Sequence, residues 1–214
     1  MKLKGAIFDL DGTLLDSMEV WDHLAEKYLT RKGMIPAPGL REMLRAMTVA
    51  ETAEYFRKEY GVPGSGETIR NEINALAESE YIDSLPLKES AGEFLHRLGE
   101  NGVRMCVATA TDRHLVEAAF KRLGVEKFFC GIITCHEMGC GKDRPDIFFK
   151  ALSILGTAMD ETVVFEDSLY AIRTAKAAGF KVAAVYDASA DGSRQEIRAA
   201  ADWYLNSFSE WEME

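Results

Sequence analysis

Two aspartates near the start of the chain, Asp9 and Asp11, follow a short apolar run and stand before a glycine. The run Gly5-Ala6-Ile7-Phe8 predicts a buried strand that ends in a polar loop at these aspartates. Because residues i and i+2 of a strand point to the same side, we expect both carboxylates to face one small volume. Carboxylates held that close suit a Mg²⁺ ion, and they also suit a nucleophile beside a general acid/base.

A second polar cluster, Thr109-Ala110-Thr111, comes directly after another apolar run. A lone acidic motif of this kind favours a simple acidic turn, so the further clusters decide the interpretation. A hydroxyl and free backbone N–H groups just before a helix suit an anion. The alternative is that Thr111 or Asp112 caps the following helix, which accounts for Thr111 but not for Thr109 at the strand end.

The third and fourth clusters add a cation and two more acids. Lys142 stands in a loop before Pro145, which suits the first turn of the next helix. A fixed ammonium there would balance carboxylates and hold a phosphate. Glu166 and Asp167 directly follow an apolar strand, as Asp9 does, and would serve as metal ligands. Their alternative role is to cap the next helix, a role that Ser168 also suits.

The hydrophobic pattern divides the chain into a purely helical region and a region in which strands and helices alternate. Residues 17–85 carry apolar stripes at helical spacing with breaks at 33–39 and 61–66, so we expect a small helical bundle. The remainder alternates between short apolar strands and helices, which predicts βαβ units and a mainly parallel, Rossmann-like α/β sheet. In such sheets ligands bind beyond the carboxyl ends of the strands, where all four clusters stand. The predicted strands are 5–8, 103–108, 131–134, 162–165, 181–186 and 203–205, and the predicted helices are 91–102, 115–123, 145–155 and 169–178.

Composition narrows the class of protein. The net charge of −10 argues against nucleic acid and anionic membrane as partners, because both need basic patches. No stretch approaches the roughly 18 apolar residues of a membrane span, and no signal peptide precedes the first strand, so we expect a cytoplasmic protein. The group Cys135, His136 and Cys140 matches no zinc spacing, which favours reduced, structural thiols over a metal site.

The four clusters together resemble the haloacid dehalogenase-like superfamily of phosphotransfer enzymes over nearly the whole chain. The family motif Asp-x-Asp-Gly-Thr matches residues 9–13, and its Ser or Thr after a strand matches Thr109. Its lysine matches Lys142, and its acidic pair matches Glu166-Asp167. The resemblance is to the subgroup of β-phosphoglucomutase and phosphoglycolate phosphatase, which carries a helical cap. It implies a catalytic core of residues 1–16 and 87–214 and an inserted cap domain of residues 17–86.

The resemblance also implies a role for each motif residue. Asp9 attacks phosphorus to form an aspartyl phosphate, and Asp11 protonates the leaving oxygen and then activates water. Mg²⁺ is bound by the Asp9 side chain, the Asp11 backbone carbonyl and Asp167, with Glu166 nearby or bound through water. Thr109 and Lys142 hold the phosphoryl oxygens, and the backbone N–H groups of residues 10–12 and those after Thr109 complete the cage. The substrate-binding residues implied beside them are Gly12, Thr13 and Ala110.

These roles predict a Mg²⁺-dependent phosphatase that hydrolyses a small phosphorylated metabolite. A phosphosugar mutase is the first alternative, and a non-catalytic binding protein on the same scaffold is the second. Where the mutase branch places a His and an Arg, this chain has Trp21 and Val49, with Arg45 one helical turn earlier. Trp21 and Arg45 are candidate substrate contacts, although the apolar stripe around Trp21 favours cap core for that residue. Arg41 and Lys88 are further candidates.

Overall fold

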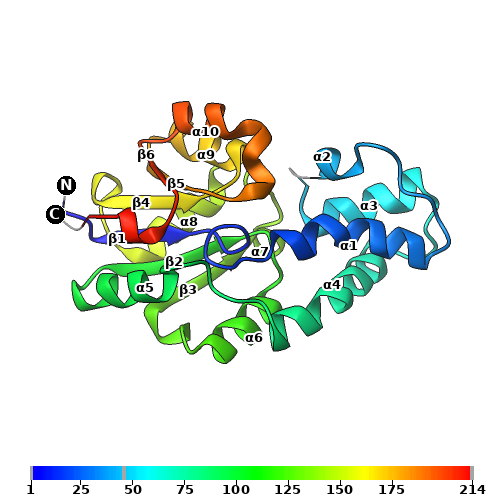
Figure 1. Ribbon diagram of the computed structural model, residues 1–214, viewed down its shortest axis with the longest axis horizontal. Coiled ribbons are helices and arrows are strands. Elements are labelled where there is room, and N and C mark those ends of the chain that lie inside the picture. Colours follow the sequence, from blue (N-terminus) through cyan, green and yellow to red (C-terminus); the bar gives the residue numbers. More distant parts are fainter. Residues whose placement is uncertain (1, 45–46, 213–214) are drawn as a thin grey trace.

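The computed structural model describes residues 2–44 and 47–212, which form one six-stranded parallel sheet (Figure 1). The strand order is β3-β2-β1-β4-β5-β6, and every neighbouring pair is parallel. The strands are β1 (Gly5–Phe8), β2 (Arg104–Thr109), β3 (Phe129–Thr134), β4 (Thr162–Glu166), β5 (Lys181–Val185) and β6 (Trp203–Leu205). The predicted α/β class with a parallel sheet is confirmed, and β3 begins two residues before the predicted strand.

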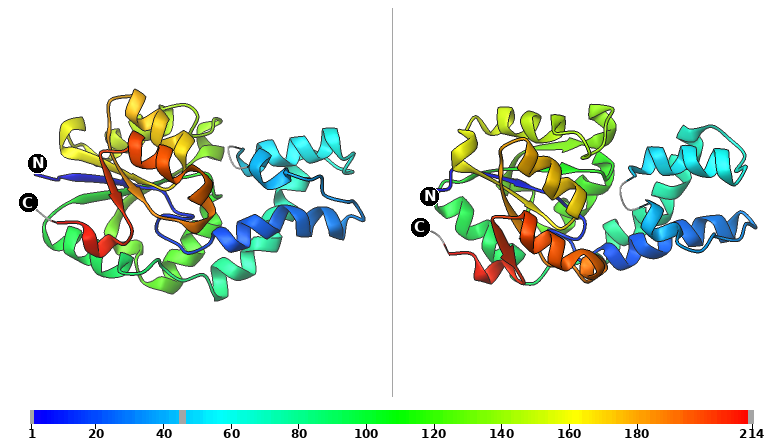
Figure 2. Two further views of the ribbon diagram at one scale, coloured as in Figure 1. Left: turned by 45° about the horizontal axis from the view of Figure 1, so that its top comes forward. Right: turned by 90° about the horizontal axis from the view of Figure 1, so that it is seen from above.

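Helices cover both faces of this sheet (Figure 2). Along β1, Ala6 and Phe8 belong to one buried cluster and Ile7 belongs to the other, as the alternation of a strand requires. Because both faces are covered, the strands are almost continuously apolar. One face packs against α5 (Ala91–Glu100) and α6 (Arg113–Leu123), and the other packs against α8 (Asp146–Leu155), α9 (Leu169–Ala177) and α10 (Arg194–Ala200). A short helix, α7 (Cys135–Met138), follows β3.

The central strands β1 and β4 are locked together just beneath their polar ends. The rings of Phe8 and Phe165 stack with centroids 4.7 Å apart, and both side chains are fully buried. Each phenylalanine immediately precedes an acidic residue, Asp9 or Glu166. Strand order reverses between β1 and β4, because the chain moves outward through β2 and β3 and returns to β4. Ligands of doubly wound sheets bind at such a reversal.

Between β1 and β2 the chain forms a helical insert, residues 17–86, beyond the carboxyl ends of the strands (Figure 1). Its helices are α1 (Met18–Arg31), α2 (Leu40–Leu44), α3 (Val49–Glu59) and α4 (Gly66–Asp83). The insert enters and leaves through neighbouring segments. The N–H of Asp16 donates to the carbonyl of Pro86 over 3.0 Å, and the N–H of Lys88 donates to that of Leu14 over 2.8 Å. This geometry agrees with the predicted helical bundle.

The helix α3 begins with its own cap. The hydroxyl of Thr48 accepts from the N–H of Glu51 over 3.2 Å, and the Glu51 carboxylate accepts from the N–H of Thr48 over 2.7 Å. This capping box starts a new helix inside a region whose apolar stripe runs on from Leu40 to Tyr60. Across the described part of the chain, no helix combines the length and the apolar character needed to cross a bilayer.

Candidate active site

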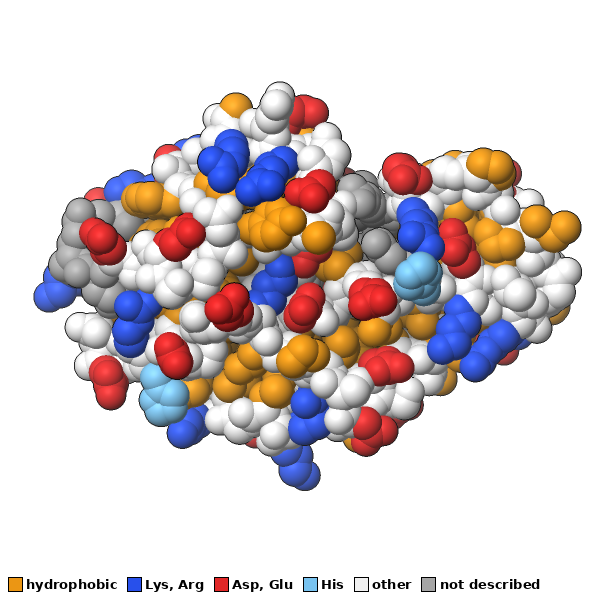
Figure 3. Space-filling model, in the orientation of Figure 1, with side chains coloured by type: hydrophobic (Ala, Val, Ile, Leu, Met, Phe, Trp, Pro, Cys, Tyr) orange, Lys and Arg blue, Asp and Glu red, His pale blue; other side chains and the backbone are white. Residues whose placement is uncertain are grey.

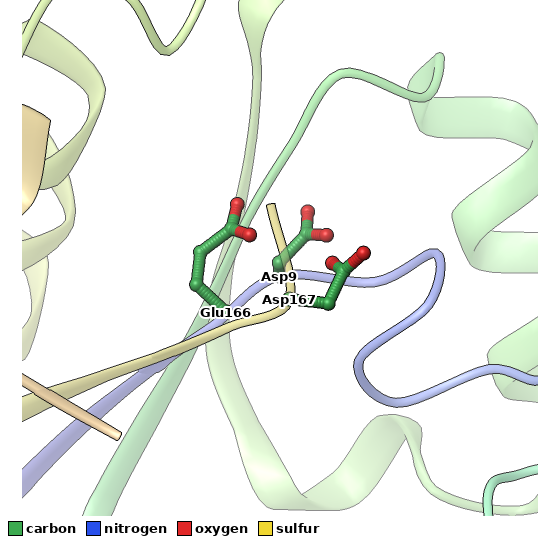
Figure 4. A group of neighbouring side chains, drawn as sticks. All are labelled: Asp9, Glu166 and Asp167. Carbon is green, nitrogen blue, oxygen red and sulfur yellow. The ribbon is translucent and has the colours of Figure 1, made fainter. Parts of the chain in front are cut away.

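Three buried carboxylates meet at the carboxyl ends of β1 and β4. The N–H of Asp9 donates to the carbonyl of Phe165 over 3.0 Å, so the strand pairing continues up to the site. One carboxylate oxygen each of Asp9, Glu166 and Asp167 lies within 4.8 Å of the others. Figure 4 shows the three side chains pointing the same way from the two strand ends. The topology therefore gathers acids that are more than 150 positions apart in the sequence.

Lys142 supplies the cation of this cluster. It lies in the loop before α8 and is 3% exposed. Its ammonium pairs with the Asp9 carboxylate and, over 2.7 Å, with Oε1 of Glu166. Burial lowers the pKa of Lys142, but the facing carboxylates of Asp9 and Glu166 more than offset that effect, and its pKa lies well above the ordinary value. The ammonium is therefore a permanent positive charge beside Asp9.

One ammonium does not balance three carboxylates. Burial raises the pKa of Asp9 to about 7 against the opposing effect of Lys142. Burial, followed by the charges of Glu166 and Asp9, raises the pKa of Asp167 well above its ordinary value. This electrostatic strain marks a place where a divalent cation would be stabilising, and the hard oxygen donors fit Mg²⁺.

The individual carboxylates differ in how free they are to bind a metal. Glu166 uses one oxygen for Lys142 and accepts the N–H of Ser168 with the other, over 2.7 Å. Asp9 and Asp167 therefore offer the better ligand atoms, and Glu166 holds the lysine. The side chain of Asp11 lies outside this acidic cluster, which leaves its backbone carbonyl as the group predicted to bind the ion.

Gly12 and Thr13 support Asp167 rather than line the cavity above it. Gly12 has a φ of +80°, and a Cβ at this position would lie 2.6 Å from Oδ2 of Asp167. Glycine is thus required both for its backbone conformation and for the close approach of Asp167. The fully buried Thr13 donates its hydroxyl to Oδ1 of Asp167 over 3.1 Å.

Asp11 is surrounded by hydroxyl groups instead of charges. Its Oδ1 accepts from Ser17 over 2.6 Å and from Tyr81, and its Oδ2 accepts from Thr111. Ser17 and Tyr81 were not among the predicted site residues. The predicted alternative that Thr111 or Asp112 caps the following helix is met by Asp112 and not by Thr111. Asp112 occupies the N-cap position of α6, and the Thr111 side chain points to Asp11 instead.

Thr109 stands at the end of β2 with 1% of its surface exposed. Its hydroxyl oxygen accepts from the N–H of Thr111 over 3.0 Å. Because a hydroxyl is also a donor, its hydrogen is available for an oxyanion. Thr109, Ala110 and Lys142 line the same cavity as Asp9 and Asp11, so the structure brings these predicted residues together.

The cavity measures about 180 Å³ and lies between the sheet edge and the helical insert. Its insert side is mainly apolar, with Trp21 among the lining residues. Trp21 is half-buried and packs against the core as well, so its position agrees with either predicted role. The other apolar lining residues from the insert are Met18, Leu24, Ala25, Leu44, Met47, Val49 and Ile73.

The cationic residues predicted as candidate substrate contacts differ in their positions relative to the cavity. Arg41 lines the cavity and forms a 3.0 Å ion pair with Glu26. Lys88 is not among the lining residues and pairs over 2.7 Å with Asp187, so the structure does not bring it to this cavity. Arg45 lies outside the described residues.

Comparisons with known proteins agree with this arrangement. The family model of the haloacid dehalogenase-like hydrolases matches residues 3–179. Hexitol phosphatase A of Escherichia coli is 29% identical over 197 residues, which are 91% of this chain and 88% of that protein. A phosphorylated carbohydrates phosphatase of Thermotoga maritima is 27% identical over 194 residues, which are 84% of this chain and 83% of that protein.

Solved structures show the same architecture. CbbY from Rhodobacter sphaeroides, crystallised in complex with phosphate, has a TM-score of 0.84 and 25% identity, with 97% of this chain and 96% of that chain covered. The family match spans most of the sequence, and the motifs that predicted the family converge at one sheet edge. The chain therefore belongs to the haloacid dehalogenase-like hydrolases.

Proposed function

We propose that this protein is a Mg²⁺-dependent phosphatase that hydrolyses a small phosphorylated metabolite through an aspartyl phosphate on Asp9. The observation that carries the proposal is the pairing of a buried Asp9 with Lys142 at the floor of a cavity, beside two more carboxylates. A carboxylate nucleophile needs its charge stabilised and an incoming phosphate needs a cation, and this arrangement provides for both. The phosphatase names of the relatives support it.

In the first half-reaction, a carboxylate oxygen of Asp9 attacks phosphorus and the bond to the leaving oxygen breaks. Asp11 gives its proton to that oxygen. In the second half-reaction, Asp11 takes a proton from water as the water oxygen attacks phosphorus. Asp9 is released and inorganic phosphate leaves. Lys142 and the hydroxyl of Thr109 hold the phosphoryl oxygens throughout.

Residues Asp9 and Asp167, with the backbone carbonyl of Asp11, would hold the metal. When bound, Mg²⁺ supplies positive charge that offsets the carboxylates and the phosphoryl group. Thr13 and Gly12 keep Asp167 in place for this task, and Glu166 keeps Lys142 in place.

We also propose that residues 1–16 and 87–214 form the catalytic core and that residues 17–86 form a cap domain. The apolar wall of the insert favours a phosphate monoester with a compact organic group over a bisphosphate. On the face shown in Figure 3, acidic and basic side chains are interspersed rather than gathered into a basic patch. That surface supports a small metabolite, not a nucleic acid, as the partner.

The experiment is hydrolysis of 4-nitrophenyl phosphate with and without Mg²⁺. We expect activity that requires Mg²⁺, and Asp167→Ala should raise the Mg²⁺ concentration for half-maximal rate by about tenfold or more. Asp143→Ala is the matched control, because Asp143 is exposed and follows Lys142 directly. Full activity of the wild-type protein in excess chelator would overturn the proposal.

A further inference from the structure

A tyrosine of the helical insert contacts the proposed acid/base. Tyr81 lies near the end of α4, 70 positions from Asp11 in the sequence, and is fully buried. Its hydroxyl donates to Oδ1 of Asp11. Burial, followed by the charge of Asp11, raises the pKa of Tyr81 well above its ordinary value, so the hydroxyl keeps the proton that it donates.

The hydroxyl of Tyr81 has its direction set by a second residue. The indole Nε1 of Trp21 in α1 donates to the Tyr81 oxygen over 2.6 Å. An indole N–H is only a donor, so the Tyr81 oxygen must accept it and the phenolic hydrogen remains for Asp11. The result is a one-way chain from Trp21 through Tyr81 to Asp11.

The backbone around Tyr81 is fixed to the core. Arg122 of α6 donates from Nε to the carbonyl of Tyr81 over 3.2 Å, and its Nη2 donates to the carbonyl of Leu85. The end of α4 is thereby tied to a helix that packs on the sheet. The phenolic oxygen accordingly has a defined position relative to Asp11.

The terminal torsion of an aspartate is soft, so hydrogen bonds decide which way the carboxylate faces. Oδ2 of Asp11 has Thr111 as a donor, and Oδ1 has Ser17 and Tyr81. We propose that Tyr81 is a positioning residue that orients the Asp11 carboxylate for proton transfer, and that Trp21 orients Tyr81. This inference rests on the proposed function, in which Asp11 is the acid/base.

The test is Tyr81→Phe, which removes one oxygen and keeps the ring. Asp11 protonates the leaving oxygen before the first irreversible step, so kcat/KM reports the effect. We expect kcat/KM for an alkyl phosphate to fall by about tenfold or more, because misplacement of a catalytic group is costly. For 4-nitrophenyl phosphate, whose leaving group needs little protonation, the loss should stay below about twofold.

The matched control is Tyr28→Phe. Tyr28 is another buried tyrosine of the insert, and its hydroxyl donates to Glu72 over 2.6 Å. The Tyr28→Phe substitution should leave kcat/KM unchanged for both the alkyl phosphate and 4-nitrophenyl phosphate. Equal losses on the two substrates in Tyr81→Phe, or no loss on either, would overturn the positioning role.

A second measurement is independent of turnover. In ¹⁵N-labelled protein, the indole N–H resonance of Trp21, assigned with Trp21→Phe, should shift in Tyr81→Phe and also in Asp11→Asn, because Tyr81 links the two residues. It should stay in place in Tyr28→Phe. An unchanged resonance in both Tyr81→Phe and Asp11→Asn would overturn the inference, while an inactive wild-type protein would contradict the proposed function alone.

Discussion

Asp9 and Asp11 are two residues apart and have opposite surroundings. Asp9 faces an ammonium and two carboxylates, whereas Asp11 faces hydroxyl groups from Ser17, Tyr81 and Thr111. Environments that differ this much allow two identical side chains to take different roles in one reaction. In the proposed mechanism, the charged environment serves the nucleophile and the hydroxyl environment serves the acid/base.

Asp9→Asn should lower phosphatase activity to less than about one per cent, because an amide is not a nucleophile for phosphorus. The substitution is nearly isosteric, so the circular dichroism spectrum should stay that of the wild type. Asp16→Asn, which changes an exposed acid of the same region, should keep full activity. Substantial turnover by Asp9→Asn would mean that another group is the nucleophile.

Gly12→Ala should weaken Mg²⁺ activation through Asp167. The new Cβ would lie 2.6 Å from the Asp167 carboxylate, which must move away. Gly102→Ala is the control, since Gly102 has a φ of +71° and a Cβ added there would meet nothing within 4 Å. Both variants should lose about 1 kcal/mol of stability from backbone strain, but only Gly12→Ala should need more Mg²⁺. Equal Mg²⁺ requirements would show that Asp167 is not a ligand.

Residue types and spacing predicted the acids, the lysine and the threonine that the structure brings together at the cavity. They did not predict the donors to Asp11, because Tyr81 and Thr111 lie 70 and 100 positions away from it. A hydroxyl residue carries no local signal of its long-range partner. For the same reason two roles stayed open for Thr111, an anion site or a helix cap, since its place before a helix also favours capping.

At the scale of elements, the ion pair of Lys88 with Asp187 ties the segment after the insert to the loop after β5. Lys88 also donates to the carbonyl of Tyr186 over 2.6 Å. Burial raises the pKa of Asp187, but hydrogen bonds from Lys88 and Ser189 outweigh it, and the net pKa is lowered. The pair therefore stabilises the folded state at neutral pH.

Lys88→Met should lower the free energy of unfolding at pH 7 by about 3 kcal/mol, because it leaves the Asp187 carboxylate buried without a cation. The pKa of Asp187 is lowered on folding, so this contribution is complete above the unfolded value and is lost as the pH falls below about 4. Urea unfolding of both proteins at several pH values checks this. Lys4→Met, which breaks a half-exposed pair with Glu161, should cost less than about 1 kcal/mol. Equal losses of unfolding free energy in Lys88→Met and Lys4→Met would contradict the prediction.

The strands and most helices of the core could be predicted because apolar periodicity and glycine stops mark them. The helix α10 could not, since Ile197 is its one buried residue and leaves no apolar stripe. The helix boundary before α3 was also not predicted from the sequence. A capping box at Thr48 starts that helix, and the surrounding apolar stripe hides the boundary.

At the scale of the whole molecule, the residues of the insert bear on where the phosphoryl group goes in the proposed mechanism. Trp21 and Val49 line the cavity from the insert, and neither can grip a second phosphate by charge. Among the described residues of that wall, the cation Arg41 is engaged with Glu26. Water is therefore the expected acceptor of the phosphoryl group from Asp9.

Incubation with β-glucose 1-phosphate and a bisphosphate primer should release inorganic phosphate, if this sugar reacts. Assays of phosphate and of glucose 6-phosphate in the same sample measure the partition. Accumulation of glucose 6-phosphate without matching phosphate would identify a mutase, and it would mean that Arg45 or another insert residue grips the second phosphate.

The insert leaves and rejoins the core through a narrow neck, where Asp16 bonds Pro86 and Lys88 bonds Leu14. A segment whose ends already touch can be exchanged for another of different length at little entropic cost. Recombination between relatives at this neck would thus exchange the insert wall of the cavity, while the proposed nucleophile and metal ligands remain in the core. Ser17 and Tyr81, however, travel with the insert. A functional graft therefore has to supply its own hydroxyl groups that donate hydrogen bonds to Asp11. Only relatives whose inserts carry a compatible pair of hydroxyl residues can provide such a graft.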